Sequence, residues 1–458
     1  MEAKTPIKVS LIIVVFNGAK FLPNLLESLC RIATNEVQVV VVDDGSKDQS
    51  FVIASEFKKS FCNYTLKKLD INMGVGNARN VGIELSVGDY IYFLDCDDWI
   101  SGSLLSDNDL GLGSGSDLIL SPIKRQTSNL SNESYLSALA STQYRNRQDF
   151  LSISLSSGSL PGECWGIFFR RKFLEKYQLR FKPVRIAEDL TFMAEVFVKM
   201  SSYAIAKSPV YFHSQTFGGL SKSFSTQDIE SWFCCVLSIS DISRDYLPKS
   251  SEGEVIARLF TFCYAYFLLN LILSDVKAQH VFLEKVLSEN VILNWGKRAQ
   301  NDGLAVLKRL AEVEYDDACE PQRVLKKISL TAQHAIKDIG GLANSKKIYL
   351  YCYDRLSIGV CRLMRVQNIL VSGIIDDNAD LIVVNESQSI RLLSPSQLSL
   401  EMLKGAIVVV CNDKPSVFSA IKKRLMSGEV DDLKVVAFTT ADLVKGFPLM
   451  NLLGDNQF

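Results

Sequence analysis

The chain has 458 residues, of which 47% are hydrophobic and 22% charged, with 50 basic against 51 acidic side chains. This length predicts about three domains, each large enough to bury a core, and the hydrophobic content argues against a disordered chain. The near-zero net charge gives no electrostatic ground for nucleic-acid binding, which normally shows as a basic excess.

The cysteines and the apolar runs predict a chain of the reducing cytosol. The 11 cysteines are scattered without a C-x-x-C pair, which is typical of free thiols rather than of a zinc site or a disulfide framework. The apolar run 9–16 is short and β-branched, so a buried strand explains it better than an export signal. The run 259–273 is shorter than the roughly 20 residues that span a membrane, so we expect a buried helix there.

The first hundred residues alternate between strand and helix patterns. Strands are expected at 9–16, 37–42, 65–69 and 90–94, and helices at 22–32, 50–60 and 76–85. Such alternation predicts a mainly parallel sheet, which binds its ligands beyond the carboxyl ends of the strands. Two acidic clusters fall at such ends, one at Asp43 and Asp44 and one at residues 95–98.

The rest of the chain predicts more α/β structure interrupted by a helical region. Residues 101–134 are rich in Gly, Ser and Asn, which predicts a loop around a strand at 118–121. Further strands are expected at 164–170 and 210–213, helices at 171–177 and 190–200, and a mobile segment at 217–223. Residues 227 to about 337 are helix-like, and a second, smaller βαβ unit has strands at 347–353, 370–375 and 406–411 and a helix at 416–426. We therefore expect three domains, at 1–222, 223–343 and 344–458.

An Asp-x-Asp pair at a strand end can share a divalent cation with a diphosphate, although such a pair alone is weak evidence. Here it belongs to an ordered set of motifs, namely Val14-Val15-Phe16-Asn17, Val42-Asp43-Asp44-Gly45-Ser46, the stretch 72–82, Phe93-Leu94-Asp95-Cys96-Asp97-Asp98 and Glu188-Asp189. In this order and spacing, residues 8–222 resemble the family 2 inverting glycosyltransferases. The resemblance implies an α/β fold of the GT-A type.

The resemblance also implies a nucleotide site. The strand end at Val14, Phe16 and Asn17 would contribute backbone contacts to the nucleotide, and Asp44 would accept the N3–H of a uracil or thymine. Arg79 would lie against the base or the diphosphate, and Asp95 would contact the ribose. Asp97 would bind Mn²⁺ or Mg²⁺, and Asp98 would orient the loop. A surface helix arginine is the alternative for Arg79. Gly74 and Gly76 lack the spacing of a phosphate-binding loop, so tight helix entry explains them better.

The resemblance implies that Asp189, the aspartate of the Glu-Asp pair, is the general base of the reaction. Inverting transfer needs a carboxylate that deprotonates the acceptor hydroxyl as it attacks the anomeric carbon opposite the leaving group. Glu188 would orient the acceptor or exchange roles with Asp189; its alternative is a negative charge favourable to a helix N-terminus.

Three further residues have a functional and a structural interpretation. Trp165 stands where the family places an aromatic ring near the sugar and acceptor, but a core tryptophan is equally compatible with its position. His213 is either a third metal ligand or diphosphate contact, or a strand-end histidine with a structural hydrogen bond. Lys222 would reach the diphosphate when the segment around it closes over the donor.

The unit at 344–458 resembles a Rossmann-like domain with a degenerate phosphate loop. Gly359 stands alone where several glycines would be needed, although Asp376 and Asp377 lie about 20 residues beyond the first strand. We therefore expect a structural, assembly or regulatory role, including homo-oligomer formation, rather than cofactor binding.

The resemblance implies an inverting, metal-dependent glycosyltransferase, and the cysteine pattern and the lack of an export signal favour the cytoplasm. It would move a sugar from a nucleotide donor, foremost a UDP-sugar, to a glycan or lipid-linked saccharide in bacterial surface polysaccharide synthesis. Nucleic acid is not an expected partner, and peripheral membrane association stays open because neutral charge supplies no polybasic anchor. Two alternatives remain: a sugar-phosphate nucleotidyltransferase, which needs a glycine-rich basic loop after its first strand, and a non-catalytic glycan-binding or assembly scaffold.

Overall fold

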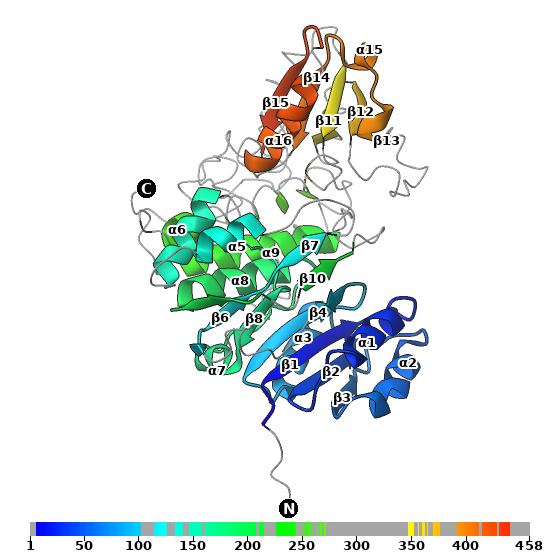
Figure 1. The fold of residues 1–458 in the computed structure, drawn as a ribbon, viewed down its shortest axis with the longest axis vertical. Helices are drawn as coiled ribbons and strands as arrows, with labels where there is room; N and C mark the ends of the chain where they lie inside the picture. Colours follow the sequence, from blue (N-terminus) through cyan, green and yellow to red (C-terminus); the bar gives the residue numbers. More distant parts are fainter. Residues whose placement is uncertain are drawn as a thin grey trace, which may run out of the picture. The chain divides into compact units, whose positions relative to one another are not determined.

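A computed structural model gives the fold of the chain. It describes residues 6–101, 114–125, 133–140, 146–157, 161–207, 210–214, 226–243, 250, 252–256, part of 259–271, 347–351, part of 356–364, 370–375, 392–411, 415–427 and 430–439. The chain divides into two compact units, Met1–Thr216 and Phe217–Phe458 (Figure 1).

The first unit is built on a seven-stranded sheet in the order β3-β2-β1-β4-β8-β6-β9. The strands are β1 (Val9–Val15), β2 (Val37–Asp43), β3 (Asn63–Lys68), β4 (Tyr90–Asp95), β6 (Leu118–Leu120), β8 (Ile167–Arg170) and β9 (Tyr203–Ile205). The first four pair in parallel, as the alternating sequence pattern predicts. The sheet as a whole is mixed, because β8 runs antiparallel to both β4 and β6.

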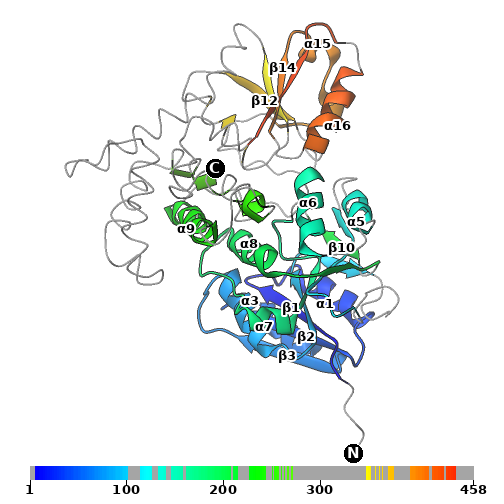
Figure 2. The ribbon, with the colours of Figure 1, turned by 90° about the vertical axis from the view of Figure 1, so that its left-hand side faces the viewer.

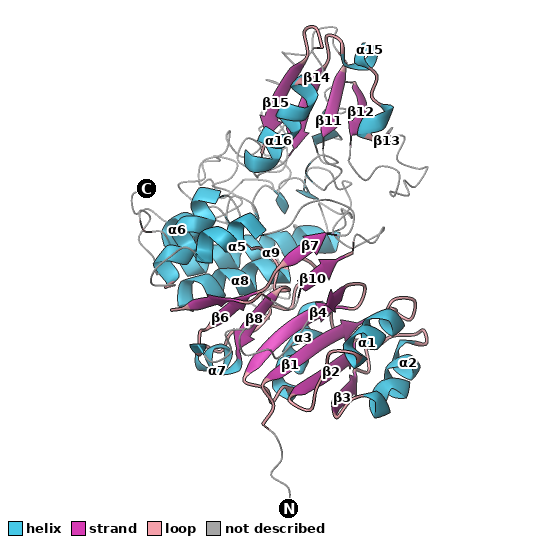
Figure 3. Ribbon diagram, in the orientation of Figure 1, coloured by secondary structure: helices cyan, strands magenta, loops and turns pink. Residues whose placement is uncertain are grey.

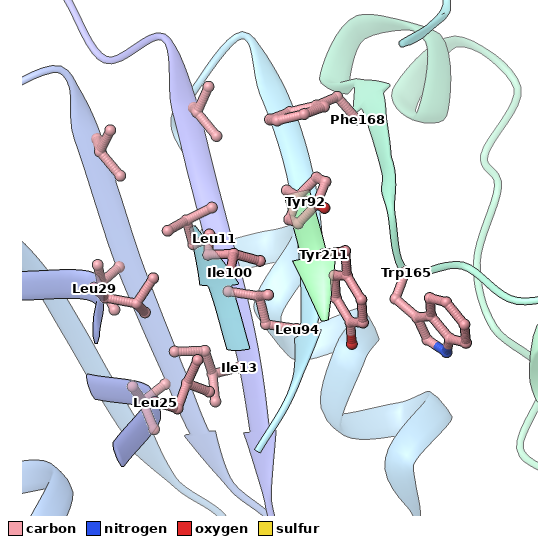
Figure 4. Close-up of a cluster of buried hydrophobic side chains, with 14 of the residues drawn as sticks. Leu11, Ile13, Leu25, Leu29, Tyr92, Leu94, Ile100, Trp165, Phe168 and Tyr211 are labelled. Carbon is pink, nitrogen blue, oxygen red and sulfur yellow. The ribbon is translucent and has the colours of Figure 1, made fainter. Parts of the chain in front are cut away.

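Helices cover both faces of this sheet, and β1 lies between α1 and α3 in Figure 2. The helices are α1 (Leu22–Cys30), α2 (Ser50–Glu56), α3 (Val75–Leu85), α5 (Glu133–Ala140), α6 (Arg147–Ser157), α7 (Arg171–Lys176) and α8 (Glu188–Lys199). On one face, Leu11 and Ile13 of β1 pack with α1 in a buried cluster (Figure 4). On the other, a Cβ at Gly82 of α3 would lie 2.4 Å from Ile12, so only glycine permits this approach of helix to strand.

A three-stranded sheet in the order β5-β10-β7 lies within the same unit and was not expected as a separate sheet. Its strands are β5 (Trp99–Ser101), β10 (Val210–His213) and β7 (Ile123–Arg125). β5 follows the acidic turn after β4 directly, and β10 pairs with it antiparallel, Phe212 opposite Trp99. This pairing brings the carboxyl end of β10 toward the acidic turn.

The second unit contains helix α9 (Thr226–Ser243) and a parallel five-stranded sheet, which Figure 3 shows in magenta. Its order is β13-β12-β11-β14-β15, made of β11 (Ile348–Tyr351), β12 (Val371–Ile375), β13 (Leu392–Leu393), β14 (Ile407–Cys411) and β15 (Lys434–Phe438), with α15 (Leu400–Leu403) and α16 (Pro415–Met426). The first strand of this unit, β11, lies at the centre of the sheet, and β13 and β15 were not anticipated. The Rossmann-like character of the unit stays a prediction. Most of the expected helical region 223–343, and Gly359, Asp376 and Asp377, lie outside the described residues. In the part of the chain that is described, no helix is long and apolar enough to cross a membrane.

Candidate active site

The carboxyl ends of three neighbouring strands bring the first candidate residues together. The register pairs Val14 of β1 with Asp95 of β4, and Val15 with Asp43 of β2. Since Asp44 follows β2 directly, it comes to the same edge of the sheet as Val14 and Asp95. Convergence at this edge was expected, because parallel sheets place their ligand sites there.

The end of β1 is held to the loop after β2. Asn17 has a φ of 50°, its backbone N–H donates to Ser46 Oγ at 2.9 Å, and its Oδ1 accepts the backbone N–H of Lys47 at 2.9 Å. Phe16, immediately before it, is 45% exposed. The strand end therefore presents Phe16 to solvent from a fixed backbone.

Asp44 holds the loop that leads into α3. Its carboxylate is 2% exposed and accepts the backbone N–H groups of Met73 at 2.7 Å and Gly74 at 2.9 Å. Burial raises the pKa of Asp44, and these two hydrogen bonds act against the rise. A carboxylate offers about four lone-pair sites, so the hydrogen bond to a pyrimidine base stays a prediction.

Gly74 and Gly76 occupy the entry to α3, as the sequence predicted. Gly74 has a φ of 88°, a conformation that favours glycine, and it directly precedes the helix. A Cβ at Gly76 would lie 3.0 Å from the carbonyl oxygen of Lys182. The two glycines therefore let α3 begin close to the segment that precedes α8.

Arg79 of α3 joins the two acidic motifs. Its Nη2 donates to Asp95 Oδ1 at 2.8 Å, and its Nη1 donates to Glu188 Oε1 at 2.7 Å and to Asp189 Oδ1 at 2.6 Å. The side chain is only 5% exposed, which is incompatible with the alternative of a surface helix arginine. Residues more than 100 positions apart thus meet at one guanidinium, while a contact of Arg79 with the base or diphosphate stays a prediction.

The Glu188 and Asp189 carboxyls form a coupled pair at the start of α8. Burial raises the pKa of both groups, the charge of Asp189 raises that of Glu188 further, and Arg79 lowers both. The interaction between the two carboxyls raises the pKa of Glu188 and lowers that of Asp189, and the buried thiol of Cys164 also lowers the pKa of Asp189. Such a pair retains a proton at a pH where ordinary carboxyls have lost theirs.

Asp98 organises the acidic turn, in agreement with its expected role. Its backbone N–H donates to the Asp95 carbonyl at 3.1 Å, and its carboxylate accepts from the Tyr211 hydroxyl and from the Ser214 backbone N–H. Burial raises the pKa of Asp98 to about 8, and the nearby charge of Asp95 adds to the rise. The buried side chain of Asp98 therefore holds the turn that contains Asp97 against Tyr211 and Ser214.

Within the described residues, no group of three or more His, Cys, Asp or Glu side chains is arranged to hold a metal. In nucleotide sites, however, Mg²⁺ usually takes one or two carboxylates and completes its shell with phosphate oxygens and water. Asp97, half-buried at the same sheet edge as Asp95, fits that donor set. His213 stacks on the Trp165 ring at 4.9 Å, and its predicted metal or diphosphate contact remains a prediction.

Trp165 lies in a stack of aromatic rings beside this edge (Figure 4). It is 8% exposed and stacks on both Tyr211 and His213, with a centroid distance of 4.9 Å to each ring. It belongs to the same buried cluster as Leu94 of β4. The core interpretation accounts for this placement, and a sugar contact stays a prediction.

Sequence reasoning did not select Cys164, Phe181 or Tyr211. Cys164 gave no signal because an isolated cysteine is most often structural. Phe181 places its ring 5.3 Å from the Arg79 guanidinium, and Tyr211 donates to Asp98, contacts that no local pattern encodes. Lys222 lies outside the described residues.

Residues 10–176 match the model of the family described as glycosyl transferase family 2. EpsH of Bacillus subtilis is 28% identical over 252 residues, covering 54% of this chain and 71% of EpsH. Poly(ribitol-phosphate) beta-N-acetylglucosaminyltransferase TarS of Staphylococcus aureus is 35% identical over 103 residues, covering 22% of this chain and 18% of TarS. The crystal structure of S. aureus TarS 1-349 in complex with UDP-GlcNAc is similar at 18% identity and a TM-score of 0.48, covering 72% and 92%.

The cholesterol galactosyltransferase of Borreliella burgdorferi is 26% identical over 230 residues, covering 48% of this chain and 63% of that protein. The family match confirms the resemblance for residues 10–176, which hold four of the five motifs; Glu188 and Asp189 lie beyond the matched residues. It also favours the glycosyltransferase interpretation over the nucleotidyltransferase.

Proposed function

Because residues 10–176 form a glycosyl transferase family 2 domain, an inverting family, we propose that this protein transfers a sugar from a UDP-sugar to a hydroxyl of a bacterial surface polymer or lipid-linked saccharide. The observation that carries the proposal is the meeting of Asp95, Glu188 and Asp189 at Arg79. This contact places the carboxylate proposed to bind the donor beside the carboxylate proposed to activate the acceptor.

The donor would lie over the carboxyl ends of β1, β2 and β4. Asp95 accepts hydrogen bonds from the ribose hydroxyls, and Phe16 and Asn17 border the nucleoside. A divalent cation held by Asp97 and the diphosphate would neutralise the charge that builds on the departing nucleoside diphosphate. Asp98 keeps that turn in place through its bonds to Tyr211 and Ser214.

Asp189 would take the proton from the acceptor hydroxyl. Its side chain is 19% exposed, against 9% for Glu188, so an acceptor approaches Asp189 more easily. A neutral Glu188 that donates its hydrogen bond to Asp189 leaves the negative charge on the more accessible carboxylate. General-base catalysis of this kind contributes typically 10²- to 10⁴-fold to a rate.

The donor and the acceptor are each proposed from a separate observation. Asp44, an acceptor-only carboxylate, suits the N3–H of uracil, a group that cytosine lacks. The polymer acceptor is supported by the 35% identity with TarS over 103 residues, since the name of that protein gives poly(ribitol-phosphate) as its acceptor.

Nucleotide binding and donor hydrolysis test the proposal. Calorimetry with UDP, GDP, CMP and dTDP in the presence of Mn²⁺ should give tightest binding for UDP. Incubation with a panel of UDP-sugars should release UDP slowly with water as acceptor, and faster with the true acceptor; the anomeric configuration of the product, read by NMR, should be inverted. Absence of binding to every nucleoside diphosphate would overturn the proposal.

A further inference from the structure

The positive charge of Arg79 lies among three carboxylates. Two of its nitrogens contact Asp95, Glu188 and Asp189 at 2.6 to 2.8 Å, and 5% of its side chain is exposed. A guanidinium with this environment has little surface left for a diphosphate. Its neighbours include the two carboxylates that the proposed reaction needs, Asp95 for the ribose and Asp189 for the acceptor.

We propose that Arg79 is a positioning residue, which sets the orientation of Asp95 and Asp189 relative to each other and does not itself bind the donor. This inference rests on the proposed function and adds to it. The guanidinium is a planar fork with five N–H donors in fixed directions. Holding one carboxylate on Nη2 and another on Nη1 therefore fixes the angle between them, which the single ammonium group of lysine cannot do.

The backbone that carries Arg79 is held on both sides. Upstream, Asp44 binds the N–H groups at the entry to α3. Downstream, the Asn80 side chain donates to the Phe181 carbonyl and accepts the Phe181 N–H, both at 2.9 Å. Phe181 in turn stacks on Phe192 of α8 at 4.1 Å. The helix with Arg79 and the helix with Asp189 are thus joined by contacts that leave the guanidinium little freedom to move.

The same contacts explain why the arginine is needed chemically. Glu188 and Asp189 are buried side by side, and without a compensating positive charge two such carboxyls tend to retain protons. Arg79 compensates that charge at the point where Asp189 has to be ionised to act as a base. A displaced Asp189 would misalign the acceptor, and misplacements of about 1 Å can reduce a rate by about 10²-fold.

The test uses the full-length protein with Arg79→Lys, which keeps the positive charge but removes the fork. We expect kcat for UDP release from the UDP-sugar, with water as acceptor, to fall by on the order of 10²-fold. Dissociation constants for uridine, UMP and UDP should rise by one common factor, because Asp95 contacts the ribose that all three share. Arg171→Lys is the matched control, since the Arg171 guanidinium likewise bridges two acceptors, in its case the Gly88 carbonyl and the Glu175 carboxylate. It should leave kcat and all three constants unchanged.

Two results would overturn the inference. A loss of UDP binding at least about tenfold larger than the loss of uridine binding would make Arg79 a diphosphate ligand. A kcat within about twofold of the wild-type value would show that the fork is not needed. Arg79→Met is a second variant that removes the charge; if it does not fold, as judged by circular dichroism, Arg79→Lys decides alone. Failure of the wild-type protein to bind or hydrolyse any donor would count against the proposed function instead.

Discussion

The carboxylate of Asp98 accepts the backbone N–H of Ser214 at 2.7 Å, although 116 positions separate the two residues. The other oxygen of the carboxylate accepts a hydrogen bond from the hydroxyl of Tyr211, which lies on β10. Asp98 is 3% exposed, so these bonds are made in the interior. The end of β10, with His213, is therefore held against the turn that carries Asp97.

The first prediction concerns stability and pH in the metal-free protein. Burial raises the pKa of Asp98 to about 8, whereas an unfolded aspartate has a pKa near 4. Between these values the folded state holds a proton that the unfolded state has lost. The stabilisation that comes from protonated Asp98 is therefore complete below about pH 4. As the pH rises toward 8, the free energy of unfolding falls because of this residue by at most about 1.4 kcal/mol per pH unit. In Asp98→Asn this contribution is absent.

Urea unfolding in EDTA at several pH values between 4 and 8 measures this difference. The free energy of unfolding of Asp98→Asn should fall less steeply with pH than that of the wild-type protein. Asp70→Asn, a change at an exposed aspartate, should follow the wild-type slope. Parallel curves for Asp98→Asn and wild type would contradict the prediction.

The second prediction separates the two carboxylates of the Glu188-Asp189 pair. Asp189→Asn should reduce transfer by on the order of 10²- to 10⁴-fold, because an amide cannot accept the hydroxyl proton, while the dissociation constant for UDP should stay near the wild-type value. Glu188→Gln keeps a hydrogen-bond donor toward Asp189, so its loss should be smaller. The measurements are single-turnover transfer rates and UDP calorimetry. Wild-type turnover in Asp189→Asn would remove this residue from the base role.

The third prediction is the acid side of the pH–rate profile. Burial raises the pKa of Asp189, so its basic form is populated only above the usual carboxyl range. The kcat of the wild-type protein should therefore decline with falling pH at values clearly above 4, the pKa of an ordinary aspartate. Arg79 lowers the pKa of Asp189, so Arg79→Met should move this decline to still higher pH. A decline that sets in no higher than the pKa of an ordinary aspartate would contradict the prediction.

The sequence predicted those parts of the site that depend on local pattern. The β-branched runs and the acidic residues after them gave the first four parallel strands and the edge at which Asp44 and Asp95 meet. The direction of β8 was not predictable, because an apolar run reads alike in parallel and antiparallel pairing. Nor was the contact between Arg79 and Asp189, since it depends on the packing of α3 against α8. The sequence implied that both residues belong to the site without showing that they touch.

The fourth prediction concerns the metal. If Asp97 holds the cation together with the donor diphosphate, Mn²⁺ should tighten UDP binding to the wild-type protein and have little effect on uridine, which has no phosphate. Asp97→Asn should lose most of this Mn²⁺ dependence while binding uridine as the wild type does. Calorimetry with and without Mn²⁺ measures the coupling. An equal effect of Mn²⁺ on UDP binding in wild type and Asp97→Asn would exclude Asp97 as the ligand.

The last prediction distinguishes the two interpretations of Trp165. The ring is 8% exposed and stacked on Tyr211 and His213, so Trp165→Ala should lower the free energy of unfolding by about 3 to 5 kcal/mol, as for other large-to-small core changes. Trp165→Phe retains an aromatic ring in the stack and should cost less. A sugar contact adds a separate effect, a change in the ratio of kcat/KM between two donor sugars in Trp165→Phe, because stability changes alone alter both values equally. Measured on folded protein, an unchanged ratio would assign Trp165 to the core alone.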